Sequence, residues 1–167
     1  MERASIYKTS IGRFLMIEDG EAITGLRLYT EDENEISDEQ LLVDYEVSQS
    51  PLMKITAKQL EEYLKGTRKS FDVKINPKGT EFQKKVWEAL RAIPYGETRT
   101  YKQIAEAVGN PKASRAVGMA NNKNPIICIT PCHRVIGANN KLVGFACGLE
   151  VKEQLLRMEN KNFSIKH

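Results

Sequence analysis

Three groups that can take part in nucleophilic chemistry follow one another in the chain: the thiol of Cys132, the imidazole of His133 and the guanidinium of Arg134. A cysteine attacks as its thiolate, and neighbouring cations can lower the pKa of its thiol below the ordinary value of about 8.5. Adjacent side chains point to opposite faces in a strand. In a turn or at the start of a helix they can act together. The run therefore leaves two interpretations open: an activated cysteine, if it lies in a turn or at a helix start, or a buried thiol beside a polar neighbour.

The remaining cysteines and histidines do not indicate a cross-linked or metal-bound protein. The chain has three cysteines, and an odd number argues against a closed disulfide framework and favours a reducing compartment. The spacing of the cysteines and histidines matches none of the usual patterns of zinc ligands; these residues are Cys128, Cys132, Cys147, His133 and His167. We therefore predict no metal site.

The composition predicts a globular protein with an uneven distribution of charge. Of 167 residues, 41% are hydrophobic and 28% charged, and no apolar run is long enough to span a bilayer or to form a secretion signal. The net charge of +3 is uneven, with −5 over residues 1–76 and +8 over 77–167. The segment 99–141 has seven basic residues against Glu106 alone. This basic segment is either a nucleic-acid surface or a solvated face.

The first half has the patterns of a small sheet with a few helical turns. Strand-like segments at 5–17 and 22–29 predict a hairpin or meander. In order, the later patterns predict an acidic solvated loop at 31–46 with a helical turn around 38–44, a helix at 56–64, a strand at 71–75 and a linker at 76–79.

The second half is mostly helical. Thr80 and Thr100 each precede a glutamine by three residues, which is the pattern of a capping box at the start of a helix. The first of these helices should stop before Pro94 and the second at Gly109. Asn110 then predicts the cap of a further helix running to about 121, with Pro111 in its first position. The second and third helices form a helix-turn-helix pattern, which favours DNA binding in this basic segment.

The second helix of that motif is lined by small residues and carries one long cation, Arg115. Small side chains allow close approach, either of a neighbouring helix or of a DNA groove with Arg115 projecting into it. The β-branched run 124–130 that follows predicts a buried strand leading to Cys132, with Cys128 as a small buried strand residue.

The segment Pro131-Cys132-His133-Arg134-Val135 resembles the signature of the O6-alkylguanine-DNA alkyltransferases. The likeness is specific and continues without gaps over residues 79–159, whereas over 1–76 it is weak. It includes Gly79-Thr80-Glu81-Phe82, Ile93-Pro94-Tyr95-Gly96-Glu97-Thr98, Tyr101, Gly109-Asn110-Pro111-Lys112-Ala113, Arg115-Ala116-Val117-Gly118, Asn124-Pro125, Gly144, Gly148-Leu149, Lys152 and Leu155-Leu156.

The resemblance implies an α/β protein with two domains. Residues 1–76 would form a small N-terminal α/β domain like ribonuclease H, and residues 77–167 a mainly helical, winged-helix-like domain with the helix-turn-helix. The implied activity is DNA repair by direct, stoichiometric and irreversible transfer of an alkyl group from O6-alkylguanine, and from O4-alkylthymine, to Cys132. Each molecule would react once, as a monomer on double-stranded DNA, without a cofactor, membrane or protein partner. The compartment would be the cytoplasm, or the nucleus in a eukaryote.

The resemblance also implies residue roles. His133 would be the base toward Cys132 through a water, Glu159 would orient His133, and Asn124 would hold the turn of the cysteine. Arg115 would replace the extruded nucleotide, while Tyr101 would help to turn it out and donate to a ring nitrogen of the base. Carbonyl groups near Cys132 and Val135 would accept from the guanine amino group. The resemblance also implies contacts with the substrate or the DNA for Ala113, Ser114, Phe145, Ala146 and Lys152.

Two positions depart from the family pattern, and Arg134 has a structural role. Phe145 stands where a tyrosine is common, and Cys147 where the family often has glycine. A side chain at position 147 is expected to narrow access for bulky groups such as benzyl. Arg134 is expected to brace the fold through an ion pair.

Other functions remain open from the residues alone. A damaged-DNA sensor of the same family would lack the cysteine, but Cys132 is present. A transcription factor would need long polar side chains on the second helix of the helix-turn-helix. A cysteine hydrolase would need an oxyanion hole, for which no local signature exists.

Overall fold

The computed structural model describes residues 2–30, 36–143 and 148–164, which form two compact units. Unit 1 comprises Met1–Lys78 and Pro125–Ile127, and unit 2 comprises Gly79–Asn124 and Cys128–His167. The short segment Pro125–Ile127 thus leaves unit 2 and joins unit 1, which a boundary drawn once along the sequence does not foresee.

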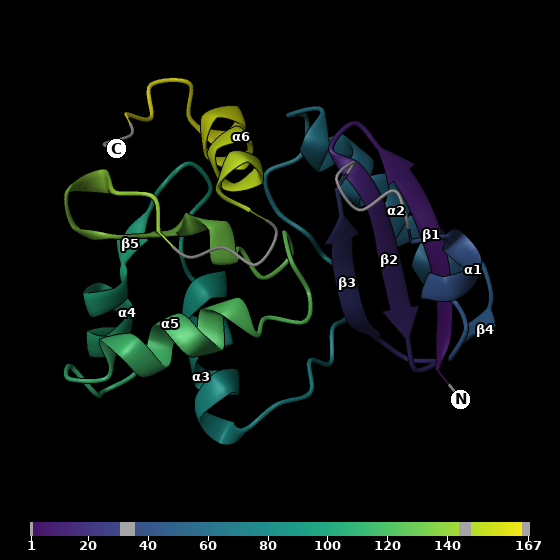
Figure 1. The fold of residues 1–167 in the computed structure, drawn as a ribbon, viewed down its shortest axis with the longest axis horizontal. Helices are drawn as coiled ribbons and strands as arrows, with labels where there is room; N and C mark the ends of the chain where they lie inside the picture. Colours follow the sequence, from purple (N-terminus) through teal and green to yellow (C-terminus); the bar gives the residue numbers. More distant parts are fainter. Residues whose placement is uncertain (1, 31–35, 144–147, 165–167) are drawn as a thin grey trace. The chain divides into compact units, whose positions relative to one another are not determined.

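Unit 1 is built on an antiparallel meander of β1 (Arg3–Thr9), β2 (Gly12–Glu18) and β3 (Ile23–Tyr29), as the alternating sequence predicts (Figure 1). Gly12 makes the tight first turn with φ of +140°, and a Cβ there would lie 2.5 Å from the Tyr29 carbonyl oxygen. The short β4 (Glu46–Val47) adds in parallel to β1, giving the order β3-β2-β1-β4.

Two helices complete unit 1. The turn α1 (Asp38–Leu41) falls where helical structure is predicted inside the acidic segment. The helix α2 (Pro51–Leu64) begins five residues earlier than predicted, because Ser50 caps it and Pro51 occupies its first turn. Its buried face presents Met53, Leu60 and Tyr63.

The predicted strand at 71–75 does not form among the described residues. Only Ile75 makes a bridge, to Ile23, through the bonds Ile23 N–H to Lys74 carbonyl at 2.9 Å and Asn76 N–H to Ile23 carbonyl at 2.8 Å. The alternation in this segment therefore reflects one residue anchored to the start of β3, and the prediction of a strand is wrong.

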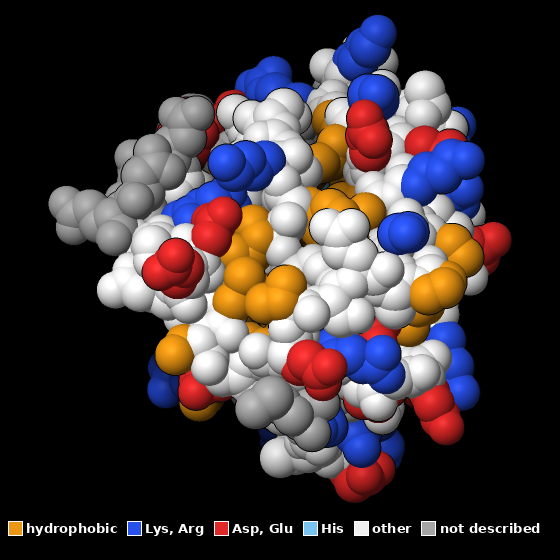
Figure 2. Space-filling view, turned by 90° about the vertical axis from the view of Figure 1, so that its right-hand side faces the viewer, with side chains coloured by type: hydrophobic (Ala, Val, Ile, Leu, Met, Phe, Trp, Pro, Cys, Tyr) orange, Lys and Arg blue, Asp and Glu red, His pale blue; other side chains and the backbone are white. Residues whose placement is uncertain are grey.

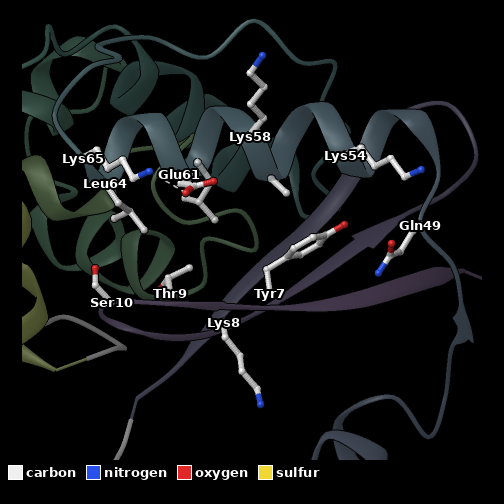
Figure 3. Close-up of a pocket in the computed structure, with 12 residues that line it drawn as sticks. Tyr7, Lys8, Thr9, Ser10, Gln49, Lys54, Lys58, Glu61, Leu64 and Lys65 are labelled. Carbon is white, nitrogen blue, oxygen red and sulfur yellow. Dashed lines mark ion pairs between the residues drawn. The ribbon is translucent and has the colours of Figure 1, made fainter.

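Unit 1 carries a groove of about 670 Å³ between β1 and α2. Figure 3 shows the ring of Tyr7 lying between the strand and the helix, with the ion pair of Glu61 and Lys65 at the C-terminal end of α2.

On the face shown in Figure 2, hydrophobic side chains appear in small groups separated by side chains of both charges. That face therefore lacks the single-sign field that nucleic-acid surfaces present.

Unit 2 is mainly helical, as predicted. Its helices are α3 (Glu81–Arg91), α4 (Tyr101–Ala107), α5 (Ser114–Asn122) and α6 (Leu149–Glu159) (Figure 1). Both predicted capping boxes are present: the hydroxyls of Thr80 and Thr100 accept from the third helical N–H, and Gln83 and Gln103 return the bond. The parallel pair β5 (Arg99–Thr100) and β6 (Val135–Ile136) holds the entry to α4 against the chain that follows the cysteine.

The third helix of the prediction starts later than the sequence suggested. Asn110 and Pro111 lie in a turn, closed by the Ala113 N–H on the Asn110 carbonyl at 3.0 Å. The helix α5 begins at Ser114, and its N-cap Ala113 offers no side-chain bond. The prediction of a helix from Asn110 is therefore wrong by one turn, although two helices still follow one another as a helix-turn-helix.

The β-branched run 124–130 is not a strand. Ile126 makes one isolated bridge, to Leu26 within unit 1, and Cys128 has a φ of +67° that breaks any extended course. Cys128 is buried as predicted, but in a turn.

The capping box of α4 provides a test of the local fold. Thr100→Ala removes the acceptor for the Gln103 N–H, so we expect unfolding to become easier by about 1 kcal/mol. Urea titration of the variant beside Thr98→Ala, for which no capping role is seen, measures this cost. An unchanged midpoint for Thr100→Ala would contradict it.

Among the described residues, no helix is long and apolar enough to cross a membrane.

Candidate active site

Cys132 opens the 3₁₀ turn η2 (Cys132–Arg134) and is 3% exposed. The turn is closed by the Arg134 N–H on the Pro131 carbonyl at 3.0 Å. The cysteine, histidine and arginine therefore do not alternate as they would in a strand. This meets the condition under which these side chains can act together.

Asn124 lies where the chain turns toward the cysteine. Its side-chain amide donates to the Thr130 carbonyl at 2.8 Å, and the same carbonyl accepts from the Cys132 N–H at 2.8 Å. Asn124 thus fixes the backbone two residues before Cys132.

His133 is fully buried and pairs with Glu159, the last residue of α6. The imidazole Nε2 lies 2.6 Å from a Glu159 carboxylate oxygen. Burial works against ionising Glu159, but hydrogen bonds from His133 and Arg134, together with the positive charge of Arg134, hold its pKa at about 2. The carboxylate only accepts, so Nε2 must carry the proton of this bond. Burial also lowers the pKa of His133, despite the opposing effect of Glu159. A neutral ring with its proton on Nε2 has Nδ1 as its acceptor, and Nδ1 is the atom that can take a proton.

Arg134 satisfies the rest of the Glu159 carboxylate. Its Nε and one terminal nitrogen donate to the two carboxylate oxygens at 2.8 and 3.0 Å, and its other terminal nitrogen donates to the Ile93 carbonyl at 2.8 Å. The Gly96 N–H adds a further bond to Glu159 at 3.1 Å. This confirms the predicted bracing ion pair of Arg134 and shows that Glu159 is held from several sides.

The resting thiol does not have the lowered pKa that its neighbours suggested. Burial raises the pKa of Cys132 to about 11, while a hydrogen bond from Asn124 and the charge of Lys152 act in the opposite direction. The adjacent Arg134 cannot help, because its guanidinium is committed to Glu159 and Ile93. The thiol is therefore protonated at neutral pH, and its reaction needs a base.

Tyr101 and Lys152 converge on one backbone acceptor. The Tyr101 hydroxyl and the Lys152 ammonium donate to the Val143 carbonyl at 2.9 and 3.0 Å, and the ammonium lies 6.0 Å from the centre of the Tyr101 ring. Lys152 is fully buried, and burial lowers its pKa to about 8. The structure therefore places Lys152 beside Tyr101 and within reach of the Cys132 charge, and not on a surface where it would meet a phosphate.

The small residues of α5 divide into two groups. Gly118 lies toward α4, where a Cβ would stand 3.7 Å from the Tyr101 ring, and Val117 and Ala120 are buried. Ala116 and Arg115 are exposed at the start of the helix, next to the half-buried Ala113 and Ser114. Close packing therefore explains Gly118, Val117 and Ala120, whereas close approach of the exposed start of α5 to a DNA groove stays a prediction. Val135 is buried at the start of β6, directly after the cysteine turn.

The predicted positions Phe145 and Ala146, and with them Cys147, lie outside the described residues. In the described ranges no three His, Cys, Asp or Glu side chains are grouped as metal ligands. The thiols of Cys128 and Cys132 are both buried.

Sequence reasoning missed Asn121, whose side-chain amide donates to the Cys132 carbonyl at 3.3 Å. Asn121 is 2% exposed, next to Ala120 on the buried face of α5. A signal for it exists in the sequence: a polar residue at the position where the apolar stripe Val117–Ala120 should continue.

The groove of unit 1 offers no comparable chemistry, since its lining includes neither cysteine nor histidine, and its carboxylate, Glu61, is paired with Lys65.

Comparison with known proteins agrees with this site. Residues 81–161 match the DNA binding domain of 6-O-methylguanine DNA methyltransferase, and residues 3–77 match the ribonuclease-like domain of the same family. The methylated-DNA–protein-cysteine methyltransferase of Methanosarcina acetivorans is 51% identical over 93% of this chain and 96% of its own length. The chain belongs to the 6-O-methylguanine DNA methyltransferase family.

Solved structures of this family extend the match to the fold. The O6-methylguanine methyltransferase of Mycobacterium tuberculosis superposes with a TM-score of 0.84 and 38% identity, over 99% of this chain and 97% of that one. A structure of the same protein in complex with DNA gives the same score over 95% and 93%. The predicted family, mixed α/β fold and enzyme class are thereby confirmed. The protein is a DNA-binding alkyltransferase that repairs DNA by direct transfer to one of its own cysteines.

Proposed function

We propose that the accepting cysteine is Cys132 and that the substrate is O6-alkylguanine, and also O4-alkylthymine, in double-stranded DNA. The observation that carries this proposal is the buried hydrogen bond between His133 and Glu159. His133 directly follows Cys132, which of the described cysteines is the one that begins a helical turn. We assign DNA binding and alkyl transfer together to residues 77–167.

The damaged nucleotide must leave the base stack, because no protein atom reaches the O6 position for in-line attack inside a duplex. In the proposed complex, α5 lies on the minor groove with Ala113 and Ser114 close to the backbone. Arg115, exposed at its start, takes the place of the extruded base, and Tyr101 helps to turn the nucleotide out. Extrusion costs on the order of a few kcal/mol, which these contacts offset.

The transfer is a displacement at the alkyl carbon. His133 Nδ1 takes the thiol proton of Cys132 through a water, and the carboxylate of Glu159 stabilises the imidazolium that forms. The thiolate then forms the new C–S bond while the C–O6 bond breaks and its electron pair stays on the guanine. Tyr101 donates a proton to the ring nitrogen, which leaves a normal guanine. The proton that His133 took from the thiol then passes through water to the Tyr101 oxygen, so His133 and Tyr101 both return to their neutral forms.

The amino group of the extruded guanine donates to backbone carbonyls near Cys132 and Val135. A thioether has no easy leaving chemistry, so each molecule reacts once. The DNA supplies the alkyl group, and the steps use only side chains of the protein. We propose that the protein works as a monomer, and in the cytoplasm, where its thiol stays reduced.

Arg115 is expected to matter only when a base has to be extruded. Arg115→Ala should slow transfer from a duplex by roughly tenfold to a hundredfold, since a side chain that stacks with bases contributes about 1–3 kcal/mol. Its reaction with the free base O6-methylguanine should be unchanged. Single-turnover rates on both substrates measure this, with Arg157→Ala as the control for an exposed arginine of unit 2. Equal losses on duplex and free base would contradict the role given to Arg115.

A further inference from the structure

Met119 is a large hydrophobic side chain on α5 that lies in solvent and has no role in the mechanism above. It is 64% exposed, against 38% for Val143 and 45% for Leu149, the other exposed large hydrophobic residues described in unit 2. A single exposed hydrophobic residue is common and needs no function by itself. The significance of Met119 comes from the face of the helix on which it lies.

The exposed face of α5 is narrow, and Met119 lies at its middle. Successive residues of an α-helix turn by about 100°, so the exposed residues of α5 fall within an arc of about 120°. The exposed residues, with Lys123 at the C-cap, are Arg115, Ala116, Met119, Asn122 and Lys123. The opposite side carries the buried residues Val117 and Ala120, where α5 packs against α3 and α4 (Figure 1).

Positive charge lies on both sides of Met119 along this face. Arg115 precedes it by about one turn, Lys123 follows it by about one turn, and Lys112 is exposed just before the helix. The helix itself contains no acidic residue. In a groove of DNA the phosphates form the walls and the base edges form the floor. A face with cations around an apolar centre fits such a groove.

Of this helix, only projecting side chains can reach the floor of a minor groove. An α-helix with its side chains is about 10–12 Å wide, whereas the minor groove is about 6 Å wide. Ala116 is too short, and Arg115 is assigned to the place of the extruded base. Met119 follows Arg115 by four residues, which is about 6 Å along the helix or about two base pairs along the groove.

We propose that Met119 contacts the floor of the minor groove about two base pairs from the damaged base and favours, at that position, a base pair without a guanine amino group. This inference rests on the proposed function. The 2-amino group of guanine is the donor that a G·C pair adds to the minor groove. A thioether is only a weak acceptor, so Met119 covers this amino group without replacing the hydrogen bond that water made to it. Repair therefore depends on the sequence beside the lesion.

The test uses duplexes that differ by one amino group outside the damaged base. Each carries one O6-methylguanine and, at a single position one, two or three pairs away on either side, a G·C or a hypoxanthine·C pair. Hypoxanthine is guanine without the 2-amino group, so the major groove is unchanged. Single-turnover transfer at protein concentrations below saturation should be about tenfold faster with hypoxanthine at one position, about two pairs from the lesion, as expected when a donor is covered without a partner.

Two variants assign this preference to Met119. Met119→Ala should abolish it, and Met119→Gln should abolish or reverse it, because the amide oxygen accepts from the amino group. Both replacements are good helix formers at an exposed position, so the fold should be kept. A hypoxanthine·C pair is weaker than G·C and eases extrusion for every variant alike, so the comparison between variants isolates Met119.

Two controls accompany these rates. Ile55→Ala removes another exposed hydrophobic side chain, 53% exposed on α2 of unit 1, and should keep the wild-type preference. Transfer from the free base O6-methylguanine should be the same in wild type and in all three variants, because no flanking base pair is present.

The outcomes separate the two claims. Equal rates on both pairs at every position in wild type, or a preference of the same size in Met119→Ala, would overturn the inference and leave the proposed function intact. Absence of transfer from any alkylated duplex by the wild-type protein would instead overturn the proposed function, and the inference with it.

Discussion

Exchange of Cys132 for serine is expected to abolish alkyl transfer while leaving binding to alkylated duplex DNA. A hydroxyl is far less acidic than a thiol, so transfer of its proton to His133 is much less favourable, and the hydroxyl itself is a weaker nucleophile. The substitution should leave the DNA contacts proposed for the start of α5 unchanged, because Ser114 and Arg115 lie on α5 and Cys132 lies in η2.

The measurement is the methyl group gained per protein molecule, beside the affinity for the same duplex. Cys132→Ser should gain none, and its affinity should stay within about threefold of wild type, since surface contacts away from the change are usually unaffected. Cys128→Ala, which removes the other cysteine among the described residues, should still gain one methyl group. Transfer by Cys132→Ser, or its loss in Cys128→Ala, would place the acceptor elsewhere.

Glu159→Gln is expected to have the second largest effect, on stability and on transfer together. The carboxylate accepts from His133, from two nitrogens of Arg134 and from the Gly96 N–H, and its side chain is 1% exposed. Removing its charge leaves the buried guanidinium of Arg134 without a counter-charge, which typically costs about 3–5 kcal/mol. Transfer should slow at least about a hundredfold, because a base that has lost its orienting carboxylate loses most of its contribution.

The stability loss should depend on pH in a defined direction. The pKa of Glu159 in the folded protein is about 2, below the ordinary value near 4.5, so its ionised form stabilises the fold. That stabilisation is complete above the unfolded pKa and is lost as the pH falls from about 5 toward 2. Wild type and Glu159→Gln should therefore differ most at neutral pH and converge in acid.

Urea unfolding at pH 7 and at pH values down to about 3 measures this convergence. Glu153→Gln is the matched control, because Glu153 is on the same helix α6 but makes an exposed ion pair with Arg157. Its stability should change by less than about 1 kcal/mol. A Glu159→Gln protein as stable and as active as wild type at pH 7 would contradict the role of the buried network.

The elements that the sequence predicts well are those set by local chemistry. The capping boxes at Thr80 and Thr100 are satisfied within four residues, so the helices they start need no information from elsewhere. The strands of the meander likewise follow from alternation between adjacent segments. Asn110 and Pro111 show the limit of the same reasoning, because the turn they form ends in a helix whose start has no capping side chain.

The predictions that are wrong or missing concern segments whose structure depends on residues distant in the sequence. The run 124–130 looks like a strand, but Ile126 finds one bridge on β3 and Cys128 turns the chain back. The buried pair of His133 and Glu159 joins residues 26 apart, and the family resemblance supplied it where periodicity could not. The raised pKa of Cys132 likewise follows from burial, which adjacency in sequence does not reveal.

The most direct test of the central claim is the mass of the intact protein after incubation with a duplex carrying one O6-methylguanine, followed by peptide mapping. We expect a gain of one methyl group, saturating at one per molecule and located on Cys132. Tight binding to the damaged duplex with no change in mass, or a methyl group on another residue, would contradict it.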